Sequence, residues 1–278
     1  MKSHRKHSTI VQDHADLKAG RLPAVEGTDI VDRIHLARYR YAAAYTNGSR
    51  VLDIATGIGY GAFLLATEGK AKEVFGVDVS QEAIGAAKQK YELPNVTFRT
   101  VTGSGLPFEN EYFDTIVSFE TVEHTAEPIS FLKELRRVLK IGGTLVISTP
   151  NKRFHSHGRR KPWNPFHTVE YYPDQFLKIV SEVFGEPFFW GGQELLSPTF
   201  KNIAIYNWIE YQYYQLRNHP SRSHYFQKLI NLKRKLLPMK PSPQSGKVGT
   251  ANHSDKRCSI EKWKLGCEPY TMVALCKK

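Results

Sequence analysis

The sequence predicts an α/β fold, with a mostly parallel sheet of seven strands, helices on both faces, and a helical insertion before the last strand. Apolar stretches of strand length alternate with helical patterns along the chain, and a glycine-rich turn follows the first stretch. The last apolar stretch stands apart, behind a basic and aromatic-rich segment. Such alternation is typical of parallel sheets that are covered on both faces.

The candidate elements follow one another in a regular order. Strands are expected over residues 51–54, 73–77, 96–100, 114–118, 144–149, 187–190 and 270–276. A helix is expected over 29–45, and another after Ser80, whose hydroxyl can cap a first turn. Apolar residues recur at helical spacing over 131–139, and Gly142 and Gly143 are expected to end that helix.

These elements divide the chain into four parts. We expect an N-terminal segment over 1–46, disordered in part before Ile30, a core over 47–192, an insertion over 193–269 and a final core strand over 270–278. Two helices are expected in the insertion, at 201–219 and 223–237, before a mobile loop at 239–255. The aromatic residues of the insertion fit packing against the core or contact with a bound ligand.

Charge and composition indicate the kind of surface and the cellular compartment to expect. The chain has 278 residues and a formal net charge of +12, and residues 201–264 hold thirteen Lys or Arg against three acidic residues. This excess is typical of a solvated surface or of one that attracts anions. The sequence has three cysteines without a C-x-x-C spacing, which favours reduced thiols and a cytoplasmic location. We expect a soluble protein, because the sequence shows no signal peptide and no apolar run of membrane-spanning length.

The glycine-rich turn predicts a nucleotide site. Gly57, Gly59 and Gly61 follow an apolar stretch and open a helix, and Asp78 ends the next expected strand. Glycines bring bare backbone close to a ligand, and the helix start presents unpaired N–H groups. Asp78 can accept hydrogen bonds from ribose hydroxyls. Dinucleotide dehydrogenases share this pattern in part, although here the spacing is G-x-G-x-G.

Three further blocks follow the turn in a fixed order. They are Leu106-Pro107-Phe108, the stretch from Phe113 to His124, and the stretch from Arg137 to Asn151. From about Arg38 to Gln193 the series resembles the class I S-adenosylmethionine-dependent methyltransferases. The resemblance implies a Rossmann-like fold whose last strand is antiparallel and lies inside the sheet. It also implies that the helix over 29–45 closes over the cofactor, and that the chain is a methyltransferase of class EC 2.1.1.

The resemblance implies a set of cofactor-binding positions. They are Asp53, Ala55, Gly57, Gly59, Asp78, Val79, Ser104, Gly105 and Phe119. Two of them depart from the family pattern. Ala55 stands where a glycine is frequent, which requires a negative φ at this alanine. Ser104 stands where an aspartate commonly accepts from the adenine amino group, and a serine accepts more weakly.

The acceptor hydroxyl needs a group that removes its proton. Glu120, Glu123 and His124 follow the fourth expected strand, and His167 comes from a downstream block. Similar sets occur in metal-dependent small-RNA 2′-O-methyltransferases and in some quinone-precursor O-methyltransferases. The four side chains suit Mg²⁺ or Mn²⁺, which would lower the pKa of a hydroxyl. Without a cation, His124 or His167 would act as general base.

The acceptor class is predicted only from resemblance. The opening from His35 to Tyr39, the strand end at Glu120 and the block Asn164-Pro165-Phe166-His167 are similar to bacterial methyltransferases associated with surface glycans. This similarity implies O-methylation of a sugar, glycan or other small-molecule hydroxyl, which the basic surface allows to be anionic. An RNA 2′-O-methyltransferase is the alternative, although no RNA-recognition motif is present. A degenerate cofactor-binding module without turnover is a third hypothesis.

Overall fold

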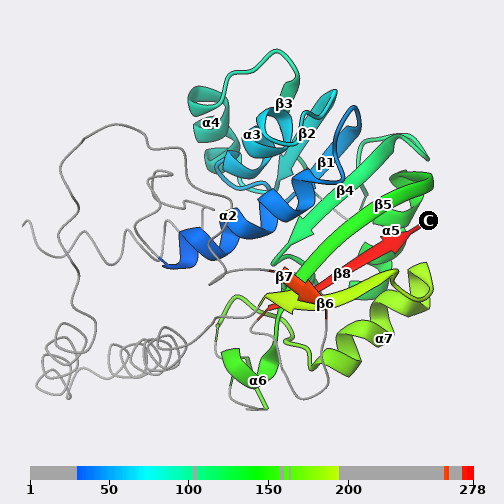
Figure 1. Cartoon of the computed structure of the whole chain (residues 1–278). Coiled ribbons are helices and arrows are strands. Elements are labelled where there is room, and N and C mark those ends of the chain that lie inside the picture. The colour runs from blue at the N-terminus through cyan, green and yellow to red at the C-terminus, as the bar shows by residue number, and fades with distance from the viewer. Residues whose placement is uncertain (1–29, 103–104, 157–159, 163, 194–259, 263–270) are drawn as a thin grey trace, which may run out of the picture.

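The computed structural model describes residues 30–102, 105–156, 160–162, 164–193, 260–262 and 271–278. These residues form one sheet with the strand order β3-β2-β1-β4-β5-β8-β6-β7 (Figure 1). The strands are β1 Arg50–Ile54, β2 Glu73–Asp78, β3 Val96–Thr100, β4 Phe113–Phe119, β5 Leu139–Pro150, β6 Phe189–Gln193, β7 Ile260–Lys262 and β8 Thr271–Lys277. The first five strands along the chain pair in parallel, as predicted.

Helices cover both faces of this sheet. They are α2 Ile30–Ala43, α3 Tyr60–Thr67, α4 Gln81–Lys90, α5 Pro128–Val138, α6 Lys152–His155 and α7 Pro173–Phe184, with a 3₁₀ turn η1 at Val122–His124. Ser80 caps α4 as predicted, because its hydroxyl accepts a hydrogen bond from the backbone N–H of Ala83 at 3.1 Å. Among the described residues no helix has the length and apolar character that a membrane crossing requires.

The C-terminal part of the sheet confirms one prediction and corrects two. Strand β8 runs antiparallel between β5 and β6, as the resemblance implied. An eighth strand, β7, pairs with β6 inside the segment that was predicted to be a helical insertion. Helix α5 ends at Val138, before the glycines, because Leu139 is already extended and begins β5. The two predicted insertion helices and the loop lie outside the described residues.

The two faces of the sheet hold two separate apolar cores. On β1, Val51 packs with α2, α3 and α4 on one face, whereas Leu52 packs with α5 and α7 on the other. Neighbouring side chains of a strand point to opposite faces, so an unbroken apolar stretch fills both cores. This double burial explains why the strands were predicted as apolar runs rather than as alternating patterns.

Helix α2 is held against α3 by one aromatic ring. Figure 1 shows α2 crossing the sheet where β4 and β5 end. Tyr39 of α2 is buried and packs edge-on against Tyr60 and Phe119. It lies so close to Gly61 that a Cβ added there would come within 2.1 Å of the ring. The glycine at position 61 therefore lets α2 dock.

Replacing Gly61 with alanine is expected to destabilise the protein by about 1–3 kcal/mol, because the added methyl group overpacks this contact. Gly85 of α4 is the matched control, since a Cβ added there meets nothing within 4 Å. Gly85→Ala should instead stabilise by roughly 0.5–1 kcal/mol, because glycine is the poorer helix former. Urea unfolding measures both changes. Equal effects of the two substitutions would contradict the proposed docking contact.

Candidate active site

The glycine-rich turn lies at the carboxyl ends of β1 and β2. Gly57 and Gly59 have positive φ values of 55° and 85°, which glycine adopts without strain. The backbone N–H of Gly57 donates to Asp78 Oδ2 at 2.9 Å, and that of Ser80 donates to Oδ1 at 2.9 Å. Asp78 therefore anchors the turn. Its carboxylate has further lone pairs for the ribose hydroxyls that the sequence assigned to it.

The backbone at Ala55 corrects one sequence prediction. A negative φ was expected there, but the angle is +56°. This left-handed conformation costs a non-glycine residue about 1–2 kcal/mol. The positive φ of Ala55 turns the chain sharply out of β1. The next residue is held in place, because the backbone N–H of Thr56 donates to the carbonyl of Val77 in β2. The turn keeps its shape despite the alanine because its neighbours are tied down.

Asp53 lies beneath the turn and is fully buried. Its carboxylate accepts hydrogen bonds from the hydroxyl of Tyr39 at 3.0 Å and of Thr56 at 2.6 Å. Burial raises the pKa of Asp53 to about 7. Asp53, which was predicted to bind the cofactor, therefore connects α2 to the turn through these two hydrogen bonds.

The other predicted cofactor positions differ in exposure. Val79 is 74% exposed at the end of β2, where an apolar ring could rest on it. Gly105 is exposed in the loop after β3, and Ser104 lies outside the described residues. Phe119 is buried at the end of β4, beneath Tyr39. The described positions lie at the carboxyl ends of β1, β2 and β4 or in the segments that follow β1, β2 and β3, so they share the carboxyl edge of the sheet.

Glu120 is separated from the other predicted metal ligands. It has a φ of +49° directly after β4. Its Oε1 lies 3.0 Å from Nη1 of the buried Arg38 and accepts a hydrogen bond from the Ser148 hydroxyl at 2.8 Å. The carboxylate is therefore committed to an ion pair, and the metal-like group contains the other three predicted residues without it.

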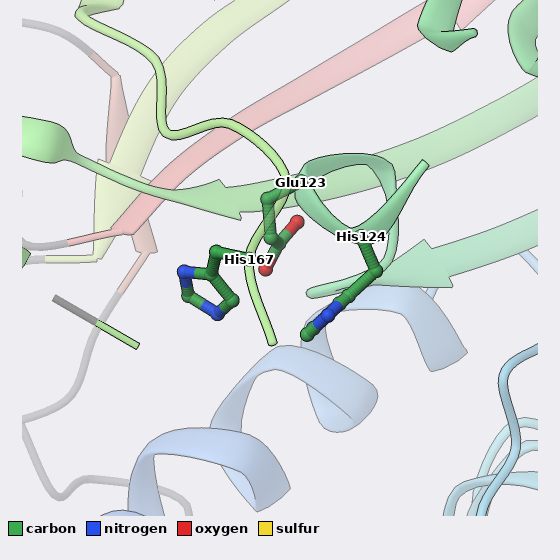
Figure 2. A group of neighbouring side chains, drawn as sticks. All are labelled: Glu123, His124 and His167. Atoms are coloured by element: carbon green, nitrogen blue, oxygen red, sulfur yellow. The ribbon is translucent and has the colours of Figure 1, made fainter. Parts of the chain in front are cut away.

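Glu123, His124 and His167 come together, with ligand atoms that all lie within 4.8 Å of one another (Figure 2). Glu123 is fully buried, and its Oε2 accepts from the Thr149 hydroxyl at 2.9 Å. Its Oε1 has no hydrogen-bond partner in the described part of the chain. Burial, with the negative charge of Glu120 nearby, holds the pKa of Glu123 well above its usual range.

Hydrogen bonds fix the tautomer of His124. Its Nδ1 lies 2.9 Å from the carbonyl oxygen of Phe166, which can only accept, so Nδ1 carries the proton. The lone pair of the neutral ring is then on Nε2. Burial lowers the pKa of His124, which keeps the ring neutral at pH 7. Thr168 adds a second contact, because its hydroxyl donates to the His124 carbonyl at 3.2 Å.

His167 is held on both ring nitrogens. Its Nδ1 lies 2.8 Å from the buried carboxylate of Glu170, and its Nε2 lies 3.0 Å from the side-chain nitrogen of Asn164. A carboxylate partner orients an imidazole and raises its basicity. The ring packs edge-on against His124 with 4.8 Å between centroids. Of the two histidines, His124 is the one whose basic nitrogen makes no hydrogen bond within the described residues.

Three residues of this site were not predicted from sequence. Arg38 and Tyr39 belong to the opening that carried the family resemblance, but nothing in their spacing indicates an ion pair with Glu120 or a bond to Asp53. Glu170 had a readable signal, because it stands three positions after His167. That spacing is compatible with a local His–carboxylate pair.

Residues 52–147 match the methyltransferase domain family. A Mycobacterium tuberculosis protein named "Probable S-adenosylmethionine-dependent methyltransferase" is 34% identical over 148 residues, 53% of each chain. The ubiquinone biosynthesis O-methyltransferase of Roseobacter denitrificans is 38% identical over 112 residues, 40% of this chain and 44% of its own. A phthiotriol/phenolphthiotriol dimycocerosates methyltransferase of Mycobacterium leprae is 31% identical over 126 residues, 45% of this chain and 47% of its own. The chain spans about half the length of the curated relatives it matches.

Solved structures share the fold at low sequence identity. A methyltransferase of Thermotoga maritima aligns with a TM-score of 0.56 and 14% identity, over 97% of this chain and 96% of its own. The [4+2]-cyclase SpnF aligns with a TM-score of 0.56 and 17% identity, over 92% and 84%. A cyclase on this fold means that the fold alone does not identify the reaction. The domain match, the sequence relatives and the strand order agree: residues 52–147 are a methyltransferase domain, within the Rossmann-like fold of the class I S-adenosylmethionine-dependent methyltransferases.

Proposed function

We propose that this protein transfers a methyl group from S-adenosylmethionine to a hydroxyl of a sugar, glycan or related small molecule, with His124 as the general base. One observation carries the assignment of the base. The carbonyl of Phe166 holds the His124 ring with its proton on Nδ1, so that the lone pair is on Nε2. The lowered pKa of this ring keeps the base unprotonated at neutral pH.

The cofactor supplies a methyl group that is already activated as a sulfonium. The protein must therefore place the acceptor oxygen in line with that methyl group and remove the hydroxyl proton. The turn after β1 and the Asp78 carboxylate are suited to hold the cofactor, because a Gly-rich helix start and an acidic residue bind a nucleoside. His124 Nε2 would take the proton as the new C–O bond forms and the C–S bond breaks.

A divalent cation is a second way to activate the same hydroxyl. Glu123, His124 and His167 would hold it, with His167 giving up the contact between its Nε2 and Asn164, and the buried, unpartnered Oε1 of Glu123 fits a site of this kind. Each of these side chains is also oriented from behind, by Thr149, the Phe166 carbonyl and Glu170 respectively. A cation there would lower the pKa of an acceptor hydroxyl. Glu120, committed to Arg38, is not part of this proposal.

The name of one relative supports an oxygen acceptor. The Roseobacter relative is named as an O-methyltransferase of ubiquinone biosynthesis, and the Mycobacterium leprae relative is named as a phthiotriol/phenolphthiotriol dimycocerosates methyltransferase. For this chain the glycan proposal depends on the blocks around Tyr39, Glu120 and His167, which resemble bacterial methyltransferases associated with surface glycans. Cofactor, base and acceptor can be tested separately.

Cofactor binding is tested by replacing Asp78 with asparagine or alanine. Calorimetry should detect S-adenosylmethionine and S-adenosylhomocysteine, and Asp78→Ala should weaken both by about 1–3 kcal/mol through the loss of charge-assisted hydrogen bonds. Asp78→Asn should weaken them less, because one acceptor oxygen remains. Tight binding of NADH, with no response to either sulfur compound, would reject the assignment.

The base and the cation are separated by chelation. If His124 acts alone, EDTA leaves methyl transfer unchanged, and His124→Ala lowers kcat by about 10²–10⁴-fold. If a cation is required, EDTA abolishes transfer, Mn²⁺ or Mg²⁺ restores it, and Glu123→Gln is as damaging as His124→Ala. Glu120→Gln serves as the control for the cation, since that residue lies outside the gathered group. Full activity of His124→Ala would exclude both forms.

The acceptor class is tested with a panel of hexoses, glycan fragments, quinone precursors and an RNA oligonucleotide. Release of S-adenosylhomocysteine is expected with a sugar hydroxyl, at a rate that changes little with added salt. An RNA acceptor would instead lose affinity steeply with salt, since its binding depends on phosphate contacts. Methylation of the RNA alone, with that salt dependence, would overturn the sugar proposal.

A further inference from the structure

The exposed large apolar side chains in the described part of the chain lie at two edges of the sheet. Ile141 lies near the start of β5, and Phe188 directly precedes β6, which runs in the same direction, so both lie near the edge opposite the site. Val79 and Phe166 lie at the carboxyl edge. A single exposed apolar side chain is ordinary on a protein surface. Phe166 is distinguished by its connection to the proposed base, His124.

A proline turn fixes the backbone of Phe166. The His167 backbone N–H donates to the Asn164 carbonyl at 3.1 Å, which closes the turn. Pro165 stands at the second position of this turn, where its fixed φ is favourable. The Asn164 side chain adds a second contact, because its Oδ1 accepts from the Phe166 backbone N–H at 3.0 Å. The backbone is therefore held in place although the Phe166 side chain is 44% exposed.

The same backbone segment holds the proposed base. The Phe166 carbonyl lies 2.9 Å from His124 Nδ1. Covalent geometry then keeps the Phe166 Cα within about 8 Å of His124 Nε2. An acceptor hydroxyl must lie about 3 Å from that nitrogen to give up its proton. A ligand in this position is therefore close enough to the Phe166 ring to make a second contact with it.

Polar residues surround Phe166 in the chain. Asn164 precedes it by two positions, His167 and Thr168 follow it, and the Thr168 hydroxyl donates to the His124 carbonyl at 3.2 Å. Ligand sites combine apolar or aromatic surfaces with a few polar groups that fix orientation. An aromatic ring offers a rigid, flat apolar surface. This combination fits a cyclic ligand with an apolar face and hydroxyl groups at its edge, which sugars and phenols have and open-chain alcohols lack.

We propose that the exposed ring of Phe166 is the contact surface for a ring of the acceptor, and that it selects cyclic acceptors over open-chain ones. The apolar face of the acceptor ring packs on Phe166, and a hydroxyl at the edge of that ring reaches His124 Nε2. This inference rests on the proposed function and deepens it, because it assigns a protein partner to the body of the acceptor. The contact is apolar, so it requires no charge on the acceptor.

The first experiment observes the contact in the unmodified protein. The ring resonances of Phe166 are followed by NMR in protein loaded with S-adenosylhomocysteine, during separate titrations with methyl glucoside, catechol and propanol. A saturable shift with methyl glucoside supports the contact with a sugar ring. A saturable shift with catechol alone supports the same contact with a phenol ring. Propanol is the open-chain comparison, and Phe188, which is 50% exposed at the opposite edge, is the internal control.

The second experiment measures affinity for the cyclic probe, followed at the ring resonances of His124. Phe166→Ala should weaken its binding about tenfold, because the ring contact is lost, and Phe166→Tyr should retain it. The affinity for S-adenosylhomocysteine and the tautomer of His124 should stay unchanged in Phe166→Ala, since the backbone carbonyl remains. Phe188→Ala is the matched control and should bind the probe like the unmodified protein. Circular dichroism checks that each variant is folded.

The proposal is overturned if neither cyclic probe shifts the Phe166 ring more than the Phe188 ring, or if propanol shifts it as strongly. It is also overturned if folded Phe166→Ala binds the probe like the unmodified protein, or loses affinity together with a changed His124 tautomer, because the residue then acts through the base. Failure of the proposed function gives a different result, namely no binding of S-adenosylhomocysteine or full activity of His124→Ala. Titration of the unloaded protein with the same probes then still tests the ring contact.

Discussion

The hydrogen bond from Tyr39 to the buried carboxylate of Asp53 is the interaction on which the rest of the site depends. It connects the helix that precedes the sheet with the turn that follows its first strand. Thr56 shares the same carboxylate, so the turn and the helix cannot move independently without leaving a buried polar group unpaired. The absence of a side chain at Gly61 permits this arrangement, because the Tyr39 ring fills that space.

The docked helix also determines what happens at the neighbouring strand. Arg38 precedes Tyr39 and is carried to Glu120, which leaves β4 with a positive φ. Ala55 leaves β1 in a similar conformation, so two adjacent parallel strands end in left-handed, non-glycine residues. Such strain persists where the surroundings fix it, and it is frequent at functional sites. Glu120 is held by its ion pair with Arg38 and by the hydrogen bond from Ser148. The turn at Ala55 is held by the hydrogen bonds that Asp53 accepts from Tyr39 and Thr56.

The histidine group depends on a different set of contacts. The backbone N–H groups of Thr168 and Val169 both donate to the carbonyl of Glu123, which holds the segment after β5 against the turn after β4. This pairing brings the Phe166 carbonyl to His124 and sets its tautomer. The chemistry of the site therefore comes from backbone groups as much as from side chains, because a carbonyl determines which imidazole nitrogen is basic.

The sequence by itself predicted most of the strands along the chain, the cofactor turn and two of the residues that gather around His124, namely Glu123 and His167. Those features depend on local patterns, since apolar periodicity, glycine position and capping are set by near neighbours in the chain. Only the tertiary structure decided that Glu120 pairs with Arg38 and that Ala55 is left-handed. It also added β7 to the sheet. Arg38 donates a hydrogen bond to the hydroxyl of Thr271, which lies 233 positions away in the sequence. No local pattern encodes such a contact, because it forms only when β8 has joined the sheet.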